Sequence, residues 1–199
     1  MENPSVAIGP GDALVLVDVQ NDFLPGGALA VPDGDAVVPR LSRLAGRFAT
    51  LGLPVFATRD WHPPDHCSFR EQGGPWPPHC IAHTEGAAFA AQLALPAATR
   101  IVSKATRAAA DAYSGFEGTD LDEHLRAAGA ARLFVGGLAT DYCVLNTVRD
   151  ALRLGYRVIV LTDAIRAVDV TPGDGERAIA EMVRLGAKMS DTRGGAPAC

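Results

Sequence analysis

The sequence predicts an α/β fold of three layers, doubly wound, with a mostly parallel sheet of about six strands and helices on both faces. Short continuous apolar runs recur along the 199 residues, and segments with helical spacing separate most of them. Strands and helices that alternate through short loops require right-handed crossovers and a parallel sheet covered on both sides. The length and the 48% hydrophobic content fit one packed domain, residues 1–199.

The expected strands are short apolar runs. They are Ala13 to Val17, Leu53 to Thr58, Arg100 to Ser103, Arg132 to Gly136, Arg157 to Thr162, and a short last one near Ala187 to Ser190. The first run is apolar at every position, which is typical of a strand buried on both faces rather than of an alternating surface strand.

The expected helices show apolar residues three or four positions apart. One such face holds Val37, Leu41, Leu44 and Phe48, a second holds Val144, Val148, Ala151 and Leu152, and a third holds Ile179, Met182 and Val183. A further helix is indicated by Thr119 and Asp122, which resemble a capping box, and by Gly129, where a helix would stop.

Composition excludes several classes of partner. Lys plus Arg number 18 against 23 for Asp plus Glu, a net charge of −5, and no basic block could follow a phosphate backbone, so nucleic acid is not expected. The apolar runs are too short to span a membrane, and Met1 to Gly11 lacks the features of a secretion signal, so we expect a cytoplasmic protein. Four widely spaced cysteines indicate reduced thiols rather than a disulfide scaffold.

Polar side chains follow several of the expected strands. They are Asp18, Arg59 to His62, Lys104, and Gly137 to Cys143. Because ligands bind at the carboxyl ends of strands in doubly wound folds, we expect these four clusters to converge on one edge of the sheet.

Cys143 lies at a strand-to-helix turn, where unpaired N–H groups and the helix dipole favour a thiolate. The alternative is a cysteine that packs as a small buried hydrophobe. Asp18 is either a general base or a turn acid, and Lys104 either pairs with Asp18 in a cleft or lies in solvent.

Four of the five histidines lie between Trp61 and His83, in a segment too long and too rich in Pro and Gly to be a simple connection. Asp60 and His62 would project to the same side of an extended segment, and the return of the chain would bring His79 as a third ligand. Mixed nitrogen and oxygen ligands with open positions suit a catalytic metal. A structural zinc site is the alternative, with the ligands His66, Cys67, His79 and Cys80.

Several motifs, in order from Asp18 to about Thr192, resemble those of the nicotinamidases, members of the isochorismatase-like cysteine hydrolase superfamily. The matching segments are Asp18 to Phe23, Thr58 to Pro63, Trp76 to Cys80, Asp111 to Phe116, and Ala139 to Val144. One hexamer could match by chance, but an ordered set of five is specific. Ala105 departs from the glycine often found after the family's lysine.

The resemblance implies the isochorismatase-like hydrolase fold and a triad of Cys143, Asp18 and Lys104. It implies one divalent metal on Asp60, His62 and His79, with zinc the first choice and iron or manganese the alternatives. His66 is a less secure fourth ligand, because the family varies there. A cis peptide between Leu138 and Ala139 would turn the N–H groups of Ala139 and Cys143 into an oxyanion hole. The candidates to hold a substrate ring are Phe23, Trp76, Tyr113 and Tyr142.

The implied activity is hydrolysis of nicotinamide to nicotinate and ammonia in NAD salvage, with pyrazinamide as a second substrate. The alternatives within the superfamily are another small amide or carbamoyl compound, or isochorismatase-type cleavage, against which the metal ligands argue. A non-catalytic zinc-binding or nucleotide-binding module is disfavoured, since no glycine-rich dinucleotide or phosphate-loop motif is present. Relatives commonly self-associate, so a homo-oligomer is an open expectation.

Overall fold

A computed structural model describes residues 6–192, which form a six-stranded, fully parallel sheet in the order β3-β2-β1-β4-β5-β6. The strands are β1 (Asp12–Val17), β2 (Val55–Asp60), β3 (Arg100–Lys104), β4 (Arg132–Leu138), β5 (Arg157–Arg166) and β6 (Lys188–Ser190). This arrangement confirms the predicted fold class.

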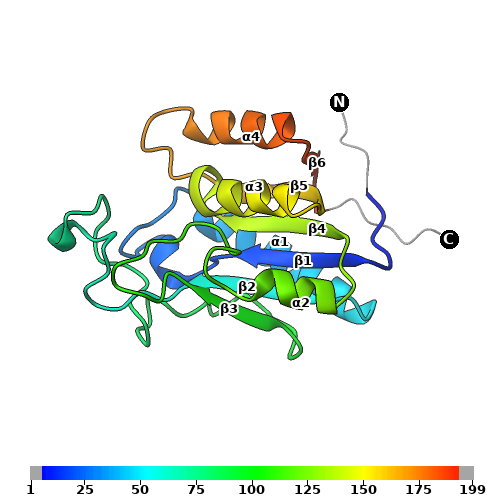
Figure 1. Ribbon diagram of the computed structural model, residues 1–199, viewed down its shortest axis with the longest axis horizontal. Coiled ribbons are helices and arrows are strands. Elements are labelled where there is room, and N and C mark those ends of the chain that lie inside the picture. Colours follow the sequence, from blue (N-terminus) through cyan, green and yellow to red (C-terminus); the bar gives the residue numbers. More distant parts are fainter. Residues whose placement is uncertain (1–5, 193–199) are drawn as a thin grey trace.

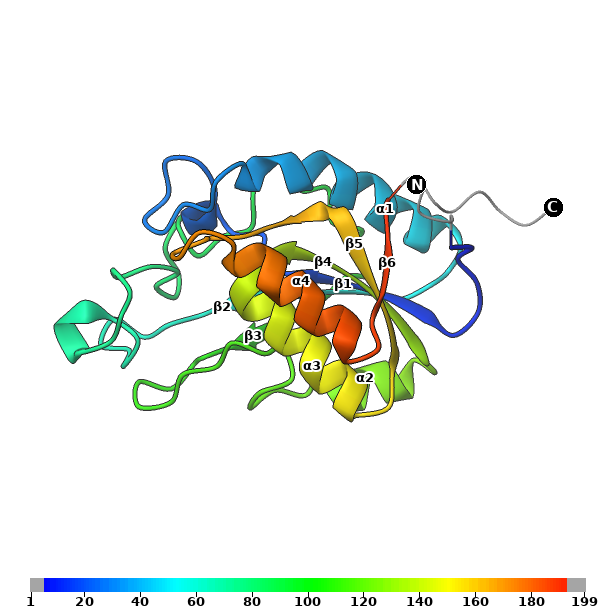
Figure 2. The same cartoon turned by 90° about the horizontal axis from the view of Figure 1, so that it is seen from above.

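Helices cover both faces of the sheet (Figure 2). They are α1 (Val38–Thr50), α2 (Leu121–Ala127), α3 (Leu145–Arg153) and α4 (Asp174–Arg184), with short 3-10 turns at Asn21–Phe23, Gly34–Val37 and Arg70–Gln72. Helix α1 packs on one face through residues such as Leu41 and Phe48. Helices α2, α3 and α4 pack on the other through residues such as Leu125, Val148 and Met182.

Each central strand supplies side chains to both cores, because alternate residues point to opposite faces of a sheet. In β1, Leu14 and Leu16 face α1 whereas Ala13, Val15 and Val17 face the other helices. The fully apolar run in the sequence is explained by this burial on both sides.

Three details of the prediction are wrong. The Thr119 hydroxyl donates to the Gly115 carbonyl and Asp120 occupies the N-cap of α2 without a side-chain hydrogen bond, so no capping box forms. Val183, expected on the buried face of α4, is 50% exposed. Strand β5 continues four residues beyond Thr162, because its pairing with β4 resumes at Ile165 after an irregularity.

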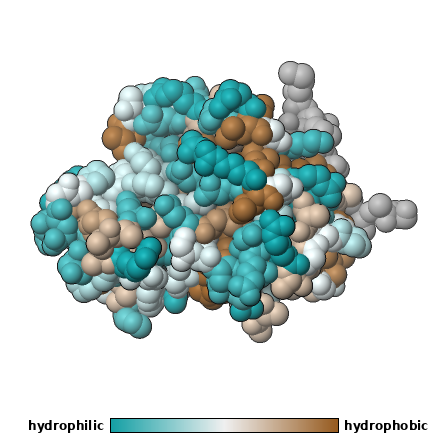
Figure 3. Space-filling model, viewed as in Figure 1, coloured by the Kyte–Doolittle hydropathy of each residue, from teal (hydrophilic) through white to brown (hydrophobic). Residues whose placement is uncertain are grey.

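The strand order reverses direction between β1 and β4, and crevices at such points bind ligands in doubly wound folds. The connection between β2 and β3, residues 61–99, extends beyond the carboxyl ends of the strands, on the left of Figure 1. On the face drawn in Figure 3, the outer side of α4 is mainly hydrophilic. In the described part of the chain, every helix is too short or too polar to cross a bilayer.

Candidate active site

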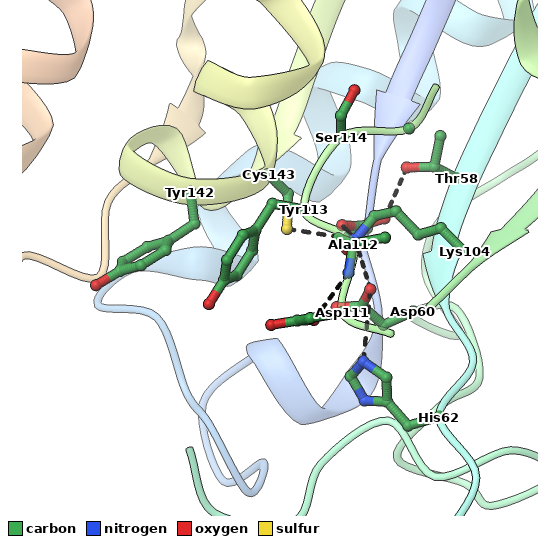
Figure 4. Close-up of polar contacts among 12 residues, drawn as sticks. Thr58, Asp60, His62, Lys104, Asp111, Ala112, Tyr113, Ser114, Tyr142 and Cys143 are labelled. Atoms are coloured by element: carbon green, nitrogen blue, oxygen red, sulfur yellow. Dashed lines mark hydrogen bonds and ion pairs between the residues drawn. The ribbon is translucent and has the colours of Figure 1, made fainter. Parts of the chain in front are cut away.

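Three side chains from separate strand ends meet near the point where the strand order reverses. Two of them, Lys104 and Cys143, are labelled in Figure 4. Lys104, the last residue of β3, places its Nζ 3.4 Å from the Cys143 Sγ and 3.0 Å from the Asp18 Oδ2. Asp18 directly follows β1, and Cys143 lies in a π-helical turn, η4 (Thr140–Val144), between β4 and α3. All three residues are at most 5% exposed.

The Lys104 ammonium is held as a cation inside the protein. Its Nζ donates to the Asp60 Oδ1 at 2.5 Å and to the Ala112 carbonyl at 3.1 Å. Burial by itself lowers the pKa of Lys104, but the carboxylates of Asp18 and Asp60 outweigh it, so the pKa lies well above its usual value. A permanent positive charge therefore sits beside the cysteine sulfur.

Asp18 is oriented by Thr58, whose hydroxyl donates to the Asp18 Oδ1 at 2.6 Å. The Asp18 backbone is left-handed (φ 49°), a conformation that aspartate tolerates better than most residues, and this turns the chain away from β1. Burial raises the pKa of Asp18, which brings a carboxylate closer to the proton affinity that a general base needs.

The surroundings of Cys143 favour the thiol over the thiolate. Burial raises the pKa of Cys143 well above its usual value, and a hydrogen bond to Asp18 acts in the same direction, while Lys104 opposes both. A thiolate can thus form where Asp18 accepts the proton and Lys104 offsets the negative charge on sulfur.

The turn that carries the cysteine has the expected cis peptide bond between Leu138 and Ala139. The Ala139 carbonyl accepts hydrogen bonds from the N–H groups of Tyr142 and Val144. Ala139 and Cys143 both line one cavity.

Asp60, His62 and His79 form a second group beside the triad. One ligand atom from each lies within 4.8 Å of the other two, and all three residues are buried. Asp60 ends β2, and the Cys80 carbonyl accepts the His62 N–H at 3.0 Å, which ties the return segment to the end of that strand.

The hydrogen bonds of the two imidazoles fit metal ligation. His62 places Nδ1 3.0 Å from the His79 carbonyl, and His79 places Nδ1 2.8 Å from the Pro77 carbonyl. Donation from Nδ1 leaves the Nε2 lone pairs available, which is the usual arrangement of metal-bound histidine. Burial lowers the pKa of His62 to about 3, so its ring is neutral, as ligation requires. The residues present therefore fit a divalent metal.

His66 is less free than these ligands. Its ring stacks on that of His62 at 4.2 Å between centroids, and its nitrogens contact the Ser68 hydroxyl at 2.7 Å and the Ala110 carbonyl at 3.2 Å. Among residues 6–192, no group with metal-binding geometry includes Cys67 or Cys80, so the structural zinc alternative is not supported.

The four aromatic residues expected to hold a ring all line a cavity of about 30 Å³ that also contains Cys143, Asp60 and His79. The Trp76 indole N–H donates to the Tyr113 hydroxyl at 2.9 Å, and the rings of Trp76 and Tyr142 meet edge to face at 5.0 Å. The rings thus hold each other in place. Phe23 contributes from the turn after β1.

Sequence reasoning missed two polar residues that organise the site. Gln20 is fully buried; its amide NH₂ donates to the Asp60 carbonyl at 2.8 Å, and its oxygen accepts the Asp60 N–H at 2.8 Å. Thr58, described above, is the second. Both lie in motifs noticed in the sequence, but no spacing signal reveals that residue 20 reaches residue 60.

The structure also explains why the family often has a glycine at the position of Ala105. Its backbone is left-handed (φ 51°), a conformation that glycine adopts without strain. The glycine common at this position in the resembling family therefore has a backbone reason, and this chain accommodates alanine there.

Comparison with known proteins gives a consistent result. The family described as Isochorismatase domain matches residues 12–194. The nicotinamidase of Escherichia coli (strain K12) is 42% identical over 201 residues, covering 90% of this chain and 94% of the relative. The nicotinamidase/pyrazinamidase of Mycobacterium tuberculosis is 42% identical over 164 residues, covering 78% and 87%.

A crystal structure of the pyrazinamidase of Pyrococcus horikoshii in complex with zinc superposes with a TM-score of 0.88 at 48% identity, covering 92% of this chain and 99% of that one.

Proposed function

The chain belongs to the isochorismatase domain family, and from this premise we propose that it is a nicotinamidase, an amidohydrolase that converts nicotinamide to nicotinate and ammonia in NAD salvage. Pyrazinamide, the corresponding pyrazine amide, is the expected second substrate. The relatives described above carry these activities in their names and match most of the chain.

One observation carries the proposal: Cys143, Asp18 and Lys104 meet in a buried site that opens into an aromatic cavity. A sulfur nucleophile, a carboxylate of raised pKa and a fixed cation are the groups that amide cleavage through a thioester requires. The aromatic walls suit a flat ring.

In the first half-reaction, Asp18 accepts the proton of Cys143 and the sulfur attacks the amide carbon. The N–H groups of Ala139 and Cys143 donate to the tetrahedral oxyanion. Asp18 then returns its proton to the departing ammonia, which leaves a thioester on Cys143.

In the second half-reaction, Asp18 removes a proton from water, whose oxygen attacks the thioester carbon; the C–S bond breaks, the acid leaves, and Asp18 returns the proton to the Cys143 sulfur. The Lys104 ammonium stabilises the negative charge that alternates between the sulfur and the carboxylate. Both halves therefore use the same proton carrier.

Asp60, His62 and His79 would hold the metal, for which we propose zinc, with His66 as a candidate fourth contact. When bound, the metal supplies a Lewis acid for a pyridine nitrogen or for water. Phe23, Trp76, Tyr113 and Tyr142 would enclose the ring and exclude bulk water from the thioester.

The test is ammonia release by the purified, zinc-loaded protein. We expect activity with nicotinamide and pyrazinamide that exceeds activity with a carbamoyl compound, and Cys143→Ala should lower kcat by at least about a thousandfold while it preserves the circular dichroism spectrum. Faster turnover of the carbamoyl compound would reject the substrate, and retained activity in Cys143→Ala would reject the nucleophile.

A further inference from the structure

The loop between β5 and α4, residues 167–173, is drawn in orange in Figure 2, and its residue Val168 lines the catalytic cavity. Val168 is partly buried against the core around α1 and lines the cavity together with Cys143 and Tyr142. Val170, two residues further along the same loop, is 61% exposed. One valine of this loop therefore faces the reacting centre and the other lies in solvent.

The position of Val168 depends on the turn that carries the nucleophile. The two carboxylate oxygens of Asp141 accept the N–H groups of Val168 at 3.0 Å and of Asp169 at 2.9 Å. Asp141 lies two residues before Cys143 in η4. The loop and the nucleophile are thus fixed to each other through one side chain.

A second contact holds the far side of the loop. The Asp169 carboxylate accepts the Gly175 N–H at 2.8 Å, in the first turn of α4. A Cβ atom at Gly175 would lie 2.6 Å from the Ala167 Cβ, so the helix start packs closely on the loop. The loop is therefore attached on both sides, and Val168 cannot withdraw from the cavity without breaking hydrogen bonds.

The cavity is small enough for one side chain to matter. Its open volume of about 30 Å³ is room for roughly two or three water molecules, so a heteroaromatic amide enters only when lining side chains move aside, and the bulk of each lining side chain limits the ring that the cavity admits. Trp76, Tyr113 and Tyr142 support one another through ring contacts and a hydrogen bond. The Val168 side chain packs against the core around α1, and its backbone N–H is held by Asp141.

We propose that Val168, positioned by Asp141, sets the size limit of the ring pocket and restricts the enzyme to amides of small rings without further substituents. This inference rests on the proposed amidase function of the same site. Asp141 acts here as a positioning residue, through the loop backbone, and Val168 is the residue that determines specificity.

The experiment compares kcat/KM for nicotinamide and for a ring-methylated nicotinamide. In Val168→Ala we expect the ratio to move about tenfold in favour of the methylated amide, since a methyl-sized change in an apolar pocket changes discrimination by roughly 10- to 200-fold. The matched control is Val170→Ala, which removes the same atoms from the same loop in solvent and should keep the wild-type ratio. Equal ratios in Val168→Ala, Val170→Ala and the wild type would overturn the proposal.

The role of Asp141 is tested with Asp141→Asn, which replaces one acceptor by a donor that faces a backbone N–H. We expect the ratio to shift in the same direction as in Val168→Ala, and the double variant to shift less than the product of the two single effects. A purely structural role would lower kcat/KM for both amides equally and leave the ratio unchanged, which would reject Asp141 as the positioning residue.

Failure of this inference can be separated from failure of the proposed function. If the wild type releases no ammonia from nicotinamide, the proposed function is wrong. The ratio of kcat/KM values is then measured with the small aromatic amide that the protein does hydrolyse and with the methylated form of that amide. A ratio that still responds to Val168→Ala and not to Val170→Ala supports the size limit, and a ratio that responds to neither rejects it.

Discussion

Asp18 controls the pH range of the proposed reaction, because only its carboxylate form can accept the Cys143 proton. Burial raises the pKa of Asp18, so activity should disappear, as the pH falls, at a higher pH than a solvent-exposed aspartate would give. The hydrogen bond from Thr58 lowers that pKa. The two effects can be separated by substitution.

Thr58→Val should therefore move the acidic limb of kcat/KM to higher pH, because the carboxylate loses the donor that stabilises its charged form. A pH profile from acid to neutral measures this shift. The control is Thr162→Val, another strand threonine, whose hydroxyl donates to the Ser190 carbonyl rather than to Asp18. An unchanged limb in Thr58→Val would argue against Asp18 as the base.

The Gln20 side chain continues the contacts between β1 and β2 beyond the end of their strand pairing. Pairing between β1 and β2 ends at Val17 and Thr58, and beyond it the Gln20 side-chain amide satisfies both the N–H and the carbonyl of Asp60. Asp60 is a proposed metal ligand, so the hydrogen bonds of Gln20 to its backbone help to hold the carboxylate in position.

Gln20→Met keeps the length of the side chain and removes its amide, so we expect the zinc affinity to fall by roughly 10- to 100-fold, measured by competition with a chelator. The control is Gln92→Met, at an exposed position, whose zinc affinity should equal that of the wild type. An affinity in Gln20→Met equal to that of Gln92→Met would show that the amide contributes only to folding.

At the scale of elements, the segment 61–99 brings the end of β2 together with the return at His79. The contacts within it are mostly turns and backbone hydrogen bonds rather than a ladder. A metal on Asp60, His62 and His79 would cross-link the two parts.

His79→Ala should lower the metal content of the dialysed protein, measured by elemental analysis, because it removes one of three ligands. The control is His83→Ala. His83 lies in the same segment but outside the ligand group, with its ring centroid 5.1 Å from that of Trp61, so this variant should retain metal. Equal metal content in the two variants would contradict the site.

The sequence predicted the elements well where burial alone determines them. The apolar runs located all six strands, because both faces of the sheet are covered. The face of Leu41, Leu44 and Phe48 located α1, because these residues pack on the sheet. Helix α2 was predicted from a capping box before Leu121 and Leu125 and from a stop at Gly129, and of these only the capping box is wrong. Its two core residues, Leu121 and Leu125, place it instead.

The site was predicted only in part from physical patterns. Strand ends pointed to Asp18, Lys104 and Cys143, since carboxyl ends of parallel strands share an edge, and the resemblance decided between the catalytic and the structural role of each. The contacts of Gln20 with Asp60 and of Asp141 with Val168 depend on the course of loops. No periodicity records that course, so they became visible only in three dimensions.

At the scale of the whole molecule, one sheet carries two cores, and both include residues of β1. We therefore predict a single cooperative unfolding transition, as expected for one domain. Zinc at about 100 times its Kd should stabilise the folded state by about 2.7 kcal/mol and raise Tm. Calorimetry with and without zinc tests both points, and two separate transitions would contradict the single domain.

The architecture also explains why the nucleophile, base and cation can come from distant parts of the sequence. The strand order places β1 beside β4 and β2 beside β3, so residues 18, 104 and 143 arrive at one crevice. The rigidity of the sheet, rather than any local motif, sets their separation.

The most direct test of the central claim is mass spectrometry of the acid-quenched enzyme during turnover of nicotinamide. We expect a nicotinoyl thioester on the peptide that contains Cys143. Ammonia release under the same conditions without an acyl group on Cys143, or with the acyl group on another residue, would contradict it.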